Sequence, residues 1–465
     1  MSTDAYRDCL DRLYARLDYE RVGMPASAAS TELRLARMRR LLRRLGDPQR
    51  HLRIVHVAGT KGKGSTSTMI ASSLSAGGIT TGLFTSPHLH RLEERFVIDG
   101  AMMDPGDLVD LYEAVLPSVE EVERRWPAPV GMTFFEVTTA MGLLHFARSG
   151  CRAVALEVGM GGRLDSTNVV RPSVSVITSI SLDHVRQLGP TLGHIAAEKA
   201  GILKRRTPAV VGVAEAEPRG VIRRIARARR CPIRQIGVDF AYSYERPTPP
   251  PARPDNGRVA VRTWRRDWGS LACPLPGEHQ ARNLAVAVAA LDALGESDPT
   301  LDLSVEAVVR GLAGLRWPAR VEVVGEAPWL VIDGAHNVAS AGALAETLQS
   351  CFPEVPRTLV FGTSRDKDLP GQLRALLPMF GAVVATRFVE NPRAVDPETV
   401  AEAVAQLGGP PCVTAADPTL ALSEARRITP GSGLICVTGS LFLAAEARAS
   451  ALGLRGVPAA PRLVP

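Results

Sequence analysis

The sequence predicts an α/β protein in which a P-loop-type parallel-sheet domain is followed by a smaller, Rossmann-like α/β domain. Two patterns lead to this fold class. An apolar, β-branched run at 52–58 passes into a glycine loop and then a helix start at Ser65. After residue 317, apolar runs alternate with helical segments, as in an open parallel sheet. Because 465 residues exceed one ordinary core, we expect an N-terminal domain at 1–316 and a C-terminal domain at 317–465.

Composition narrows the class of protein further. A content of 45% hydrophobic and 22% charged residues is typical of a globular protein. No apolar run reaches the roughly 18 residues of a membrane span, and the first residues lack the apolar core of a signal peptide. The seven cysteines are scattered and never in C-x-x-C spacing, which favours a reducing cytoplasm and argues against a zinc site. We therefore expect a cytoplasmic protein with no membrane partner.

The net charge of +7 allows two interpretations, nucleic acid or anionic small substrates. The basic run at 221–230 is explained by a solvated helix face, and no known nucleic-acid motif is present, so we expect no nucleic-acid partner. Lysine usage is more informative than net charge. Of 55 Lys and Arg residues, only positions 61, 63, 199, 204 and 367 are lysines. Lysine should persist where a compact ammonium or a deprotonatable amine is needed, so these positions mark a candidate site.

The glycine loop at 59–64 is the strongest local signal. In the order strand, glycine loop and helix, backbone N–H groups and the positive helix end converge on an anion. Lys63 adds a point charge for the outer phosphates, and the Ser65 hydroxyl can reach Mg²⁺. The general pattern G-x-x-x-x-G-K-[ST] is not met, because Gly64 follows Lys63. A plain glycine-rich turn would not need Lys63, so we interpret the loop as nucleotide-binding.

The shortened loop GTKGKGS, followed by TSPHL, resembles that of the Mur-ligase superfamily and most closely the folylpolyglutamate synthase/dihydrofolate synthase family. That family usually has Asn at position 61, although a Lys variant also occurs. Further motifs match in order: RLDSTN at 163–168, GEHQARN at 277–283, and WPAR at 317–320 with Ala319 where the family has Gly. The resemblance is dense from 51 to 201 and patchier beyond.

One carboxylate, Glu157, lies inside an apolar strand that begins at Ala153. An unpaired buried charge is costly, so this carboxylate must meet a cation. At the end of a parallel strand beside a phosphate loop it would face Mg²⁺, and a structural ion pair is the alternative. His184 follows another buried strand at the same expected edge. Taken alone, His184 is explained by a capping or core histidine, and Ser86 by an ordinary Ser-Pro turn. The resemblance instead makes Glu157, His184 and Ser86 metal ligands and implies two magnesium sites.

Lys199 closes a helical segment at 192–200. An ammonium there would be repelled by a neighbouring Mg²⁺. In the family this lysine is carbamylated by CO₂, which turns the cation into a carboxylate, so the resemblance implies a carbamylated Lys199. A surface Glu198–Lys199 pair is the structural alternative.

The segment that begins at Thr133 opens a helix, and Thr133 with Glu136 forms the pattern of a capping box. Capping is a sufficient structural explanation. The resemblance adds that the segment lines a pterin site, and the two interpretations are compatible. The residues assigned to the pterin or substrate are Thr133, Phe134, Phe135, Glu136, Leu164 and Asp165.

The resemblance also assigns the nucleotide contacts: Gly59, Thr60, Lys61, Gly62, Lys63, Gly64, Ser65, Asn283, Arg320 and Asp333. Asp333 opens the motif DGAHN after an apolar strand, where ligand sites form in α/β folds. We group His336 of this motif with Lys63 and Lys199 as catalytic residues and expect it to handle the incoming amino acid. Lys367 follows another strand and receives no role.

The function implied is an ATP-dependent ligase. A folate-type carboxylate attacks the γ-phosphate to give an acyl phosphate and ADP, and the amine of L-glutamate then displaces phosphate. The acceptor could be dihydropteroate, a folate polyglutamate tail, or both, and TFFE at 133–136 resembles the forms that use dihydropteroate. The alternatives are a Mur-type cell-wall ligase acting on a UDP-sugar peptide, a P-loop kinase or ATPase, and a nucleic-acid-binding protein. Because the family is usually monomeric, we expect a monomer.

Overall fold

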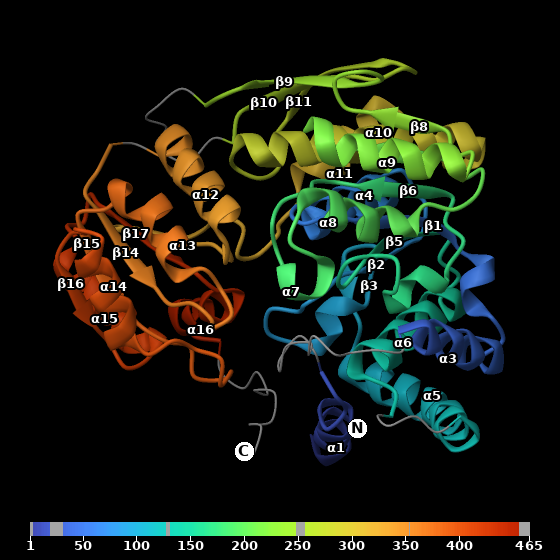
Figure 1. Cartoon of the computed structure of the whole chain (residues 1–465), viewed down its shortest axis with the longest axis horizontal. Coiled ribbons are helices and arrows are strands. Elements are labelled where there is room, and N and C mark those ends of the chain that lie inside the picture. The colour runs from blue at the N-terminus through green and yellow to red at the C-terminus, as the bar shows by residue number, and fades with distance from the viewer. Residues whose placement is uncertain (1–2, 19–30, 127–130, 248–255, 353, 455–465) are drawn as a thin grey trace.

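The protein consists of two parts that share no sheet (Figure 1). The structure is a computed structural model that describes residues 3–18, 31–126, 131–247, 256–352 and 354–454. The N-terminal part holds an eight-stranded sheet in the order β4-β3-β2-β5-β1-β6-β7-β8 and a three-stranded sheet in the order β11-β10-β9. The C-terminal part holds a six-stranded sheet in the order β12-β13-β17-β14-β15-β16. The predicted α/β fold class is confirmed.

The N-terminal strands are β1 Arg53–Ala58, β2 Thr81–Phe84, β3 Val97–Ile98, β4 Ala101–Met102, β5 Ala153–Glu157, β6 Val174–Ile177, β7 Ala209–Val211, β8 Ile233–Gln235, β9 Ala241–Glu245, β10 Arg258–Arg262 and β11 Asp267–Ala272. The helices of this part are α1 Thr3–Tyr14, α3 Thr31–Arg44, α4 Lys63–Ala76, α5 Pro105–Arg125, α6 Phe134–Arg148, α7 Val185–Leu188, α8 Leu192–Lys199, α9 Ala216–Ala228, α10 Glu278–Ser297 and α11 Val305–Ala313.

The C-terminal strands are β12 Glu322–Glu326, β13 Trp329–Ile332, β14 Arg357–Phe361, β15 Ala382–Ala385, β16 Cys412–Thr414 and β17 Leu434–Thr438. The helices of this part are α12 Val338–Cys351, α13 Leu369–Leu376, α14 Pro397–Gln406, α15 Pro418–Ile428 and α16 Leu441–Leu452. From β13 to β16 the pairing is parallel, and β12 alone of these strands runs antiparallel, at the sheet edge beside β13.

Parallel pairing brings the predicted motifs to one edge of the N-terminal sheet. Strand β1 pairs in parallel with β5 on one side, with Val57 opposite Glu157. On its other side β1 pairs in parallel with β6, with Ala58 opposite Ile177. The loops that follow β1, β5 and β6 therefore leave the sheet at the same level.

The core of the N-terminal part lies on both faces of this sheet. Ile54 of β1 packs into a cluster with residues of α5 and α6, whereas Val55 and Val57 pack into a cluster with residues of α4 and α10. Burial of each such side chain stabilises the fold by about 1.5–3 kcal/mol. Helix α10 contacts β6 and β7 as well as β9 and β10, so it lies between the two N-terminal sheets (Figure 1). This explains why the Ala-rich sequence of α10 is buried on nearly all sides.

Two local predictions have different outcomes. The basic run at 221–230 lies mostly on α9, where Ile222 is buried while Arg223 and Arg224 are exposed, so the prediction of a solvated helix face is confirmed. The residues at 91–99 also predict a strand followed by a turn, and this prediction is wrong for its first half, because Leu92–Arg95 is a 3₁₀-helix. The Glu94 carboxylate accepts the N–H groups of residues 89–91, and this local cap stabilises a helical turn over an extended chain.

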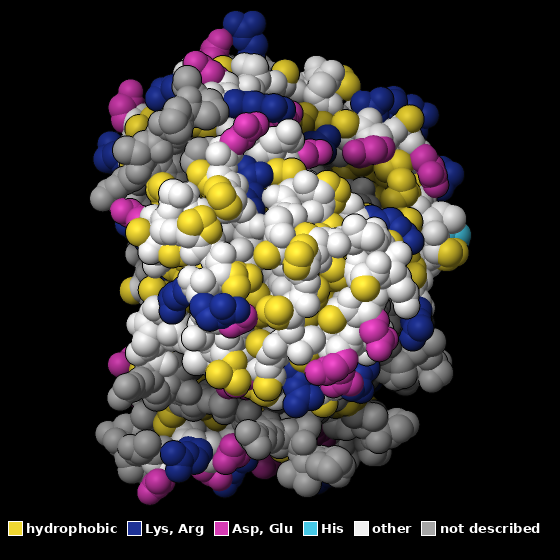
Figure 2. Space-filling view, turned by 90° about the vertical axis from the view of Figure 1, so that its left-hand side faces the viewer, with side chains coloured by type: hydrophobic (Ala, Val, Ile, Leu, Met, Phe, Trp, Pro, Cys, Tyr) yellow, Lys and Arg dark blue, Asp and Glu magenta, His cyan; other side chains and the backbone are white. Residues whose placement is uncertain are grey.

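Surface properties add little to the functional argument. On the face shown in Figure 2, basic and acidic side chains are interspersed instead of gathering into one patch. Across the described residues, no helix combines the length and apolar character needed to cross a membrane. All seven cysteines are free thiols, and all but Cys412 are buried.

Candidate active site

The glycine loop lies between β1 and α4, where Gly62 caps the helix with a φ of +80°. The N–H groups of the first helical turn, at 63–65, have no acceptor inside the helix and form the positive end that binds anions. Two loop positions require glycine because neighbouring side chains lie too close to the backbone for a Cβ atom. A Cβ on Gly59 would lie 1.9 Å from Thr178 Oγ1, and a Cβ on Gly62 would lie 2.2 Å from Asn283 Oδ1. The second contact also places Asn283 directly against the loop.

The first half of the loop is anchored to the segment that follows β6. Thr60 N donates to Ser179 O at 2.8 Å, and Lys61 N donates to Ser179 Oγ at 3.0 Å. Because these two N–H groups are already paired, the groups left for an anion are those at the start of α4. The structure therefore divides the predicted nucleotide loop into an anchoring half and a half that can bind phosphate.

Glu157, at the end of β5, is paired and almost completely buried, with 4% of its surface exposed. Its carboxylate accepts Ser86 N at 3.0 Å and lies 3.8 Å from Lys63 Nζ. The structure thus brings together the predicted Glu157, Ser86 and Lys63. Trp317 closes this corner, since a Cβ on Gly64 would lie 3.0 Å from its ring.

Lys199, at the end of α8, lies behind the loop and is 4% exposed. Its Nζ donates to Gly59 O at 2.9 Å. Burial, reinforced by the positive charge of Lys63, lowers the pKa of Lys199 to about 7. The amine is therefore partly neutral at physiological pH, which is the state that reacts with CO₂.

His184, the third predicted metal ligand, follows β6 in the chain. It caps the short helix α7 in a left-handed conformation, with a φ of 50°, and its Nε2 lies 3.9 Å from Asp183 Oδ1. Burial lowers its pKa to about 4, so the ring is neutral. Among the described residues, His, Cys, Asp and Glu side chains nowhere gather in groups of three or more that could hold a metal ion. Glu157 offers the oxygen donor that Mg²⁺ prefers, but the Lys63 and Lys199 ammonium groups oppose a cation unless Lys199 is carbamylated.

The predicted pterin residues divide into buried and accessible ones. Thr133 and Glu136 form the expected capping box, and Glu136 also accepts two hydrogen bonds from Arg37, at 2.7 and 2.6 Å. Phe134 is fully buried, and its ring stacks on that of Tyr14.

Phe135 is only partly buried and lies against Gly159, where a Cβ would be 2.6 Å from its ring. Leu164 is also partly exposed, whereas Asp165 caps the turn at 166–169 by accepting Thr167 N at 3.0 Å. Within the described part of the predicted set, Phe135 and Leu164 therefore retain the apolar surface that a planar ligand could contact.

In the C-terminal part, the predicted residues follow β13. Asp333 accepts the N–H groups of Val321 and Ala335 at 2.9 and 2.7 Å, and burial raises its pKa. Arg320 lies beside Gly334, between Ala319 and Val321, which both have a positive φ, near 54° and 50°. The glycine that the family has at position 319 is explained by this left-handed backbone.

His336 reaches across to the N-terminal part. Its Nε2 lies 2.8 Å from Lys61 Nζ, and burial lowers the pKa of His336 to about 4. Burial also lowers the pKa of Lys61, to about 8, so this ammonium remains mostly protonated at neutral pH. The structure thus joins a predicted catalytic residue of one part to the predicted nucleotide loop of the other.

Asp183 is the main site residue that the sequence reasoning missed. Its carboxylate lies 3.1 Å from Lys61 Nζ and 3.2 Å from Lys367 Nζ, and it accepts Asn337 Nδ2 at 3.1 Å. The signal was present, because Asp183 is an acidic residue just after a buried parallel strand, as Glu157 is at the end of one. It was passed over in favour of its neighbour His184.

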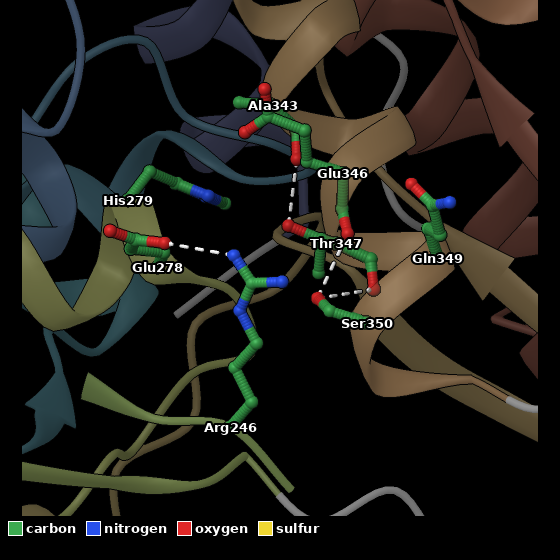
Figure 3. Close-up of a pocket in the computed structure, with 8 residues that line it drawn as sticks. All are labelled: Arg246, Glu278, His279, Ala343, Glu346, Thr347, Gln349 and Ser350. Carbon is green, nitrogen blue, oxygen red and sulfur yellow. Dashed lines mark hydrogen bonds and ion pairs between the residues drawn. The ribbon is translucent and has the colours of Figure 1, made fainter. Parts of the chain in front are cut away.

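A cavity of about 440 Å³ opens between the start of α10 and residues 343–350 of α12 (Figure 3). In this view Arg246 points toward Glu278, and the two side chains form an ion pair at 3.4 Å. His279 of the GEHQARN motif borders the same space. The α12 residues that face it were not predicted: Ala343, Glu346, Thr347, Gln349 and Ser350.

Comparison with known families matches both parts of the chain. Residues 57–291 match the Mur ligase middle domain, and residues 319–441 match the Mur ligase, glutamate ligase domain. Dihydrofolate synthase/folylpolyglutamate synthase of Bacillus subtilis is 32% identical over 447 residues, covering 96% of this chain and 98% of that protein.

A probable bifunctional folylpolyglutamate synthase/dihydropteroate synthase of Halobacterium salinarum is 38% identical over 411 residues, covering 88% of this chain but 48% of that protein. The chain spans about half the length of this relative and of its Haloferax volcanii counterpart.

Solved structures agree with this result. Mycobacterium tuberculosis folylpolyglutamate synthase complexed with ADP superimposes with a TM-score of 0.87 at 33% identity, covering 96% of this chain and 98% of that one. Escherichia coli FolC in complex with DHPP and ADP gives a TM-score of 0.79 at 28% identity, covering 93% and 100%. The glycine loop and the parallel sheets of the two parts, together with these matches, place the chain among the Mur-type ligases, with an N-terminal nucleotide-binding domain and a C-terminal domain. The chain belongs to the folylpolyglutamate synthase/dihydrofolate synthase family, and the cell-wall peptide ligase alternative is not favoured.

Proposed function

We propose that this protein is an ATP-dependent amide ligase that adds L-glutamate to a folate-type carboxylate through an acyl phosphate, releasing ADP and phosphate. The observation that carries the proposal is the gathering of Lys63, Glu157 and Lys199 around the glycine loop, with His336 of the other domain reaching Lys61 of that loop. A carboxylate must be activated before an amine can displace its oxygen. The two domains supply the two halves of that reaction.

The first half of the reaction, phosphate transfer from ATP, would take place at the edge of the N-terminal sheet; we call this the phosphate half. The N–H groups at the start of α4 and the Lys63 ammonium would bind the outer phosphates of ATP and neutralise the charge that develops during transfer. Asn283 lies against Gly62 and would contact the nucleotide from α10. Arg320 and Asp333 would add contacts from the C-terminal domain.

Magnesium and a carbamate complete this half of the proposal. Glu157, Ser86 and His184 would hold Mg²⁺, which supplies charge neutralisation at the phosphates when it is bound with ATP. A carbamate on Lys199 would provide oxygen atoms for a second magnesium site and remove the ammonium that opposes it. The pKa of about 7 for Lys199 supports this modification, because only the neutral amine attacks CO₂.

The second half of the reaction, attack by the amine, would depend on residues at the edge of the C-terminal sheet; we call this the amine half. His336 Nδ1 lies 2.9 Å from Gly334 O, a distance that requires Nδ1 to be the N–H donor and leaves Nε2 as an acceptor. We infer that this face handles the incoming amino group of L-glutamate. Closure of the two domains would also exclude water from the acyl phosphate.

The acceptor proposed is dihydropteroate, the γ-carboxylate of tetrahydrofolate polyglutamates, or both. The accessible faces of Phe135 and Leu164 suit a planar pterin. The Bacillus subtilis relative carries both activities in its name, and the Escherichia coli structure contains DHPP beside ADP. These two relatives support a bifunctional enzyme.

The remaining parts of the proposal concern context. We place the domain boundary between residues 316 and 317, which falls between the two matched family segments. We further propose a cytoplasmic monomer whose partners are ATP, L-glutamate and the folate substrate, without nucleic acid or membrane partners. The seven free cysteines support a reducing compartment.

The deciding experiment measures phosphate release from Mg-ATP with L-glutamate, in parallel with dihydropteroate and with a reduced monoglutamyl folate. Glutamate-dependent turnover with both acceptors is expected, and turnover with one of them would restrict the activity to that branch. Formation of AMP instead of ADP would contradict the acyl-phosphate mechanism. Absence of turnover with either acceptor would remove folate from the proposal and make sugar-nucleotide peptides the next substrates to test.

A further inference from the structure

Lys61 belongs to the nucleotide loop, yet its side chain extends to the other domain. Its Nζ lies 3.1 Å from Asp183 Oδ2, in its own domain, and 2.8 Å from His336 Nε2, in the C-terminal domain. Its backbone is anchored by Ser179, so the direction of the side chain is set by the loop itself. One ammonium group therefore connects the edges of the two sheets.

Hydrogen-bond roles are determined by the surroundings of His336. Since Nδ1 donates its proton to Gly334 O, Nε2 carries a lone pair and needs a donor. The Lys61 ammonium has three N–H groups and no acceptor, so it can donate to Asp183 and to His336 at the same time. The contact between Lys61 and His336 is thus a directed hydrogen bond between the domains.

The neighbours of Asp183 show what would remain without Lys61. Asp183 would still contact Lys367 and Asn337, both from the C-terminal domain. His336, in contrast, would lose the donor for Nε2, and its ring would be held only through Nδ1. An asparagine at position 61 would be too short to reach both partners.

We propose that Lys61 is an interdomain positioning residue, which holds His336 against Asp183 so that the C-terminal domain is already closed onto the nucleotide loop before substrates bind. This goes beyond a phosphate contact for the loop, because Lys61 donates to a side chain of the other domain. Its effect on catalysis rests on the proposed ligase function, whereas its effect on domain arrangement does not. The two effects can therefore be tested separately.

The first test measures the distance between the domains in ligand-free protein. Spin labels at Arg223→Cys on α9 and Glu402→Cys on α14, two exposed positions, would report this distance by pulsed electron resonance in a Cys412→Ser background. Lys61→Met keeps the length of the side chain and removes the ammonium, and Lys61→Asn shortens it. Both variants are expected to show a broader distribution with an added longer distance.

The matched control is Lys204→Met. Lys204 Nζ binds Asn168 O at 2.9 Å and Asn168 Oδ1 at 2.7 Å, entirely inside the N-terminal domain. Burial lowers the pKa of this lysine too, so its loss tests general destabilisation without touching the interdomain contact. A distribution that stays unchanged in Lys61→Met, or that broadens equally in Lys204→Met, would overturn the proposal.

The second test addresses catalysis. Because a loosely held His336 would be misaligned for the amino acid, Lys61→Met is expected to raise the KM for L-glutamate by about 10-fold. Thermal unfolding should stay close to that of the unmodified protein, since the residue acts on arrangement between domains and not on either core. An unchanged KM for L-glutamate, measured alongside normal turnover of the unmodified enzyme, would remove the catalytic part of the proposal.

Discussion

The two sheet edges that meet at the site are built in different ways. At the N-terminal edge, two of the lysines pair within their own domain: Lys63 with Glu157, and Lys199 with the carbonyl of Gly59. At the C-terminal edge, the polar groups of His336 and Lys367 find partners across the domain boundary. The difference supports the proposed division, in which Lys63 and Lys199 of the phosphate half are held within one domain, whereas the amine half depends on contacts between the domains.

Loss of Lys63 should break the phosphate half most severely. Without its ammonium, the charge that develops on the transferred phosphate is not neutralised, and we expect Lys63→Ala to lower kcat by about 10³-fold. Phosphate release gives the rate, and binding of a fluorescent nucleotide should weaken as well. Normal nucleotide affinity together with normal turnover would show that the loop does not bind phosphate through this residue.

Lys199→Ala tests whether the same half depends on a carbamate. We expect a loss of about 10²-fold in kcat, with partial recovery when short carboxylates are added, because they would replace the missing oxygen atoms. Lys204→Ala is the matched control and should need no carboxylate.

The unmodified enzyme offers a second test of the carbamate. Since the pKa of Lys199 lies near 7, the neutral amine predominates above that pH. Activation of CO₂-depleted enzyme by added CO₂ should therefore be faster at pH 8 than at pH 6, at equal dissolved CO₂. An activity that is independent of CO₂ and cannot be rescued would contradict the carbamate.

His336→Ala should impair the amine half of the reaction while leaving nucleotide binding almost unchanged. We expect kcat/KM for L-glutamate to fall by about 10-fold or more while nucleotide affinity stays within about 2-fold, because His336 acts on the amine side. Steady-state kinetics with varied glutamate, compared with nucleotide binding at equilibrium, gives both numbers. If nucleotide affinity fell as far as kcat/KM, the division into two halves would not hold.

The smallest effect concerns the junction between the halves. Ala319 is buried with a φ of 54°, a conformation that disfavours any residue with a Cβ. Ala319→Gly should therefore stabilise the protein by about 0.5–1 kcal/mol, since relief of this strain exceeds the entropy that glycine adds to the unfolded chain. Thermal or urea unfolding measures the change. A loss of stability would mean that the buried methyl group matters more than the backbone strain.

The elements that could be predicted from the sequence are those with local signals. The strand, glycine loop and helix from β1 to α4 follow from an apolar run, three glycines and a helix start. The capping box at Thr133 was recognised from two residues at fixed spacing and is confirmed by hydrogen bonds. The fold class followed from the alternation of such segments along the chain.

What could not be predicted depends on contacts between distant segments. The 3₁₀-helix at 92–95 arises because the Glu94 carboxylate accepts three preceding N–H groups. The spacing of apolar residues does not show that these hydrogen bonds favour a helical turn over a strand. Asp183 draws partners from three other segments, two of them in the other domain, so its importance appears only in three dimensions. His184 caps α7, a local role that its position after a strand does not reveal, and its role as a metal ligand stays a prediction.

The scarcity of lysine has a practical consequence for chemical biology. Four of the five lysines, at positions 61, 63, 199 and 367, lie at or beside the proposed site, and the fifth binds Asn168. An amine-selective reagent applied to the folded protein would therefore find its lysine targets almost entirely around the proposed site. Mass-spectrometric footprinting of acylated lysines would then report site occupancy directly, with bound nucleotide protecting Lys63. In most proteins such labelling is obscured by a surface covered with lysines, whereas here arginine occupies those positions.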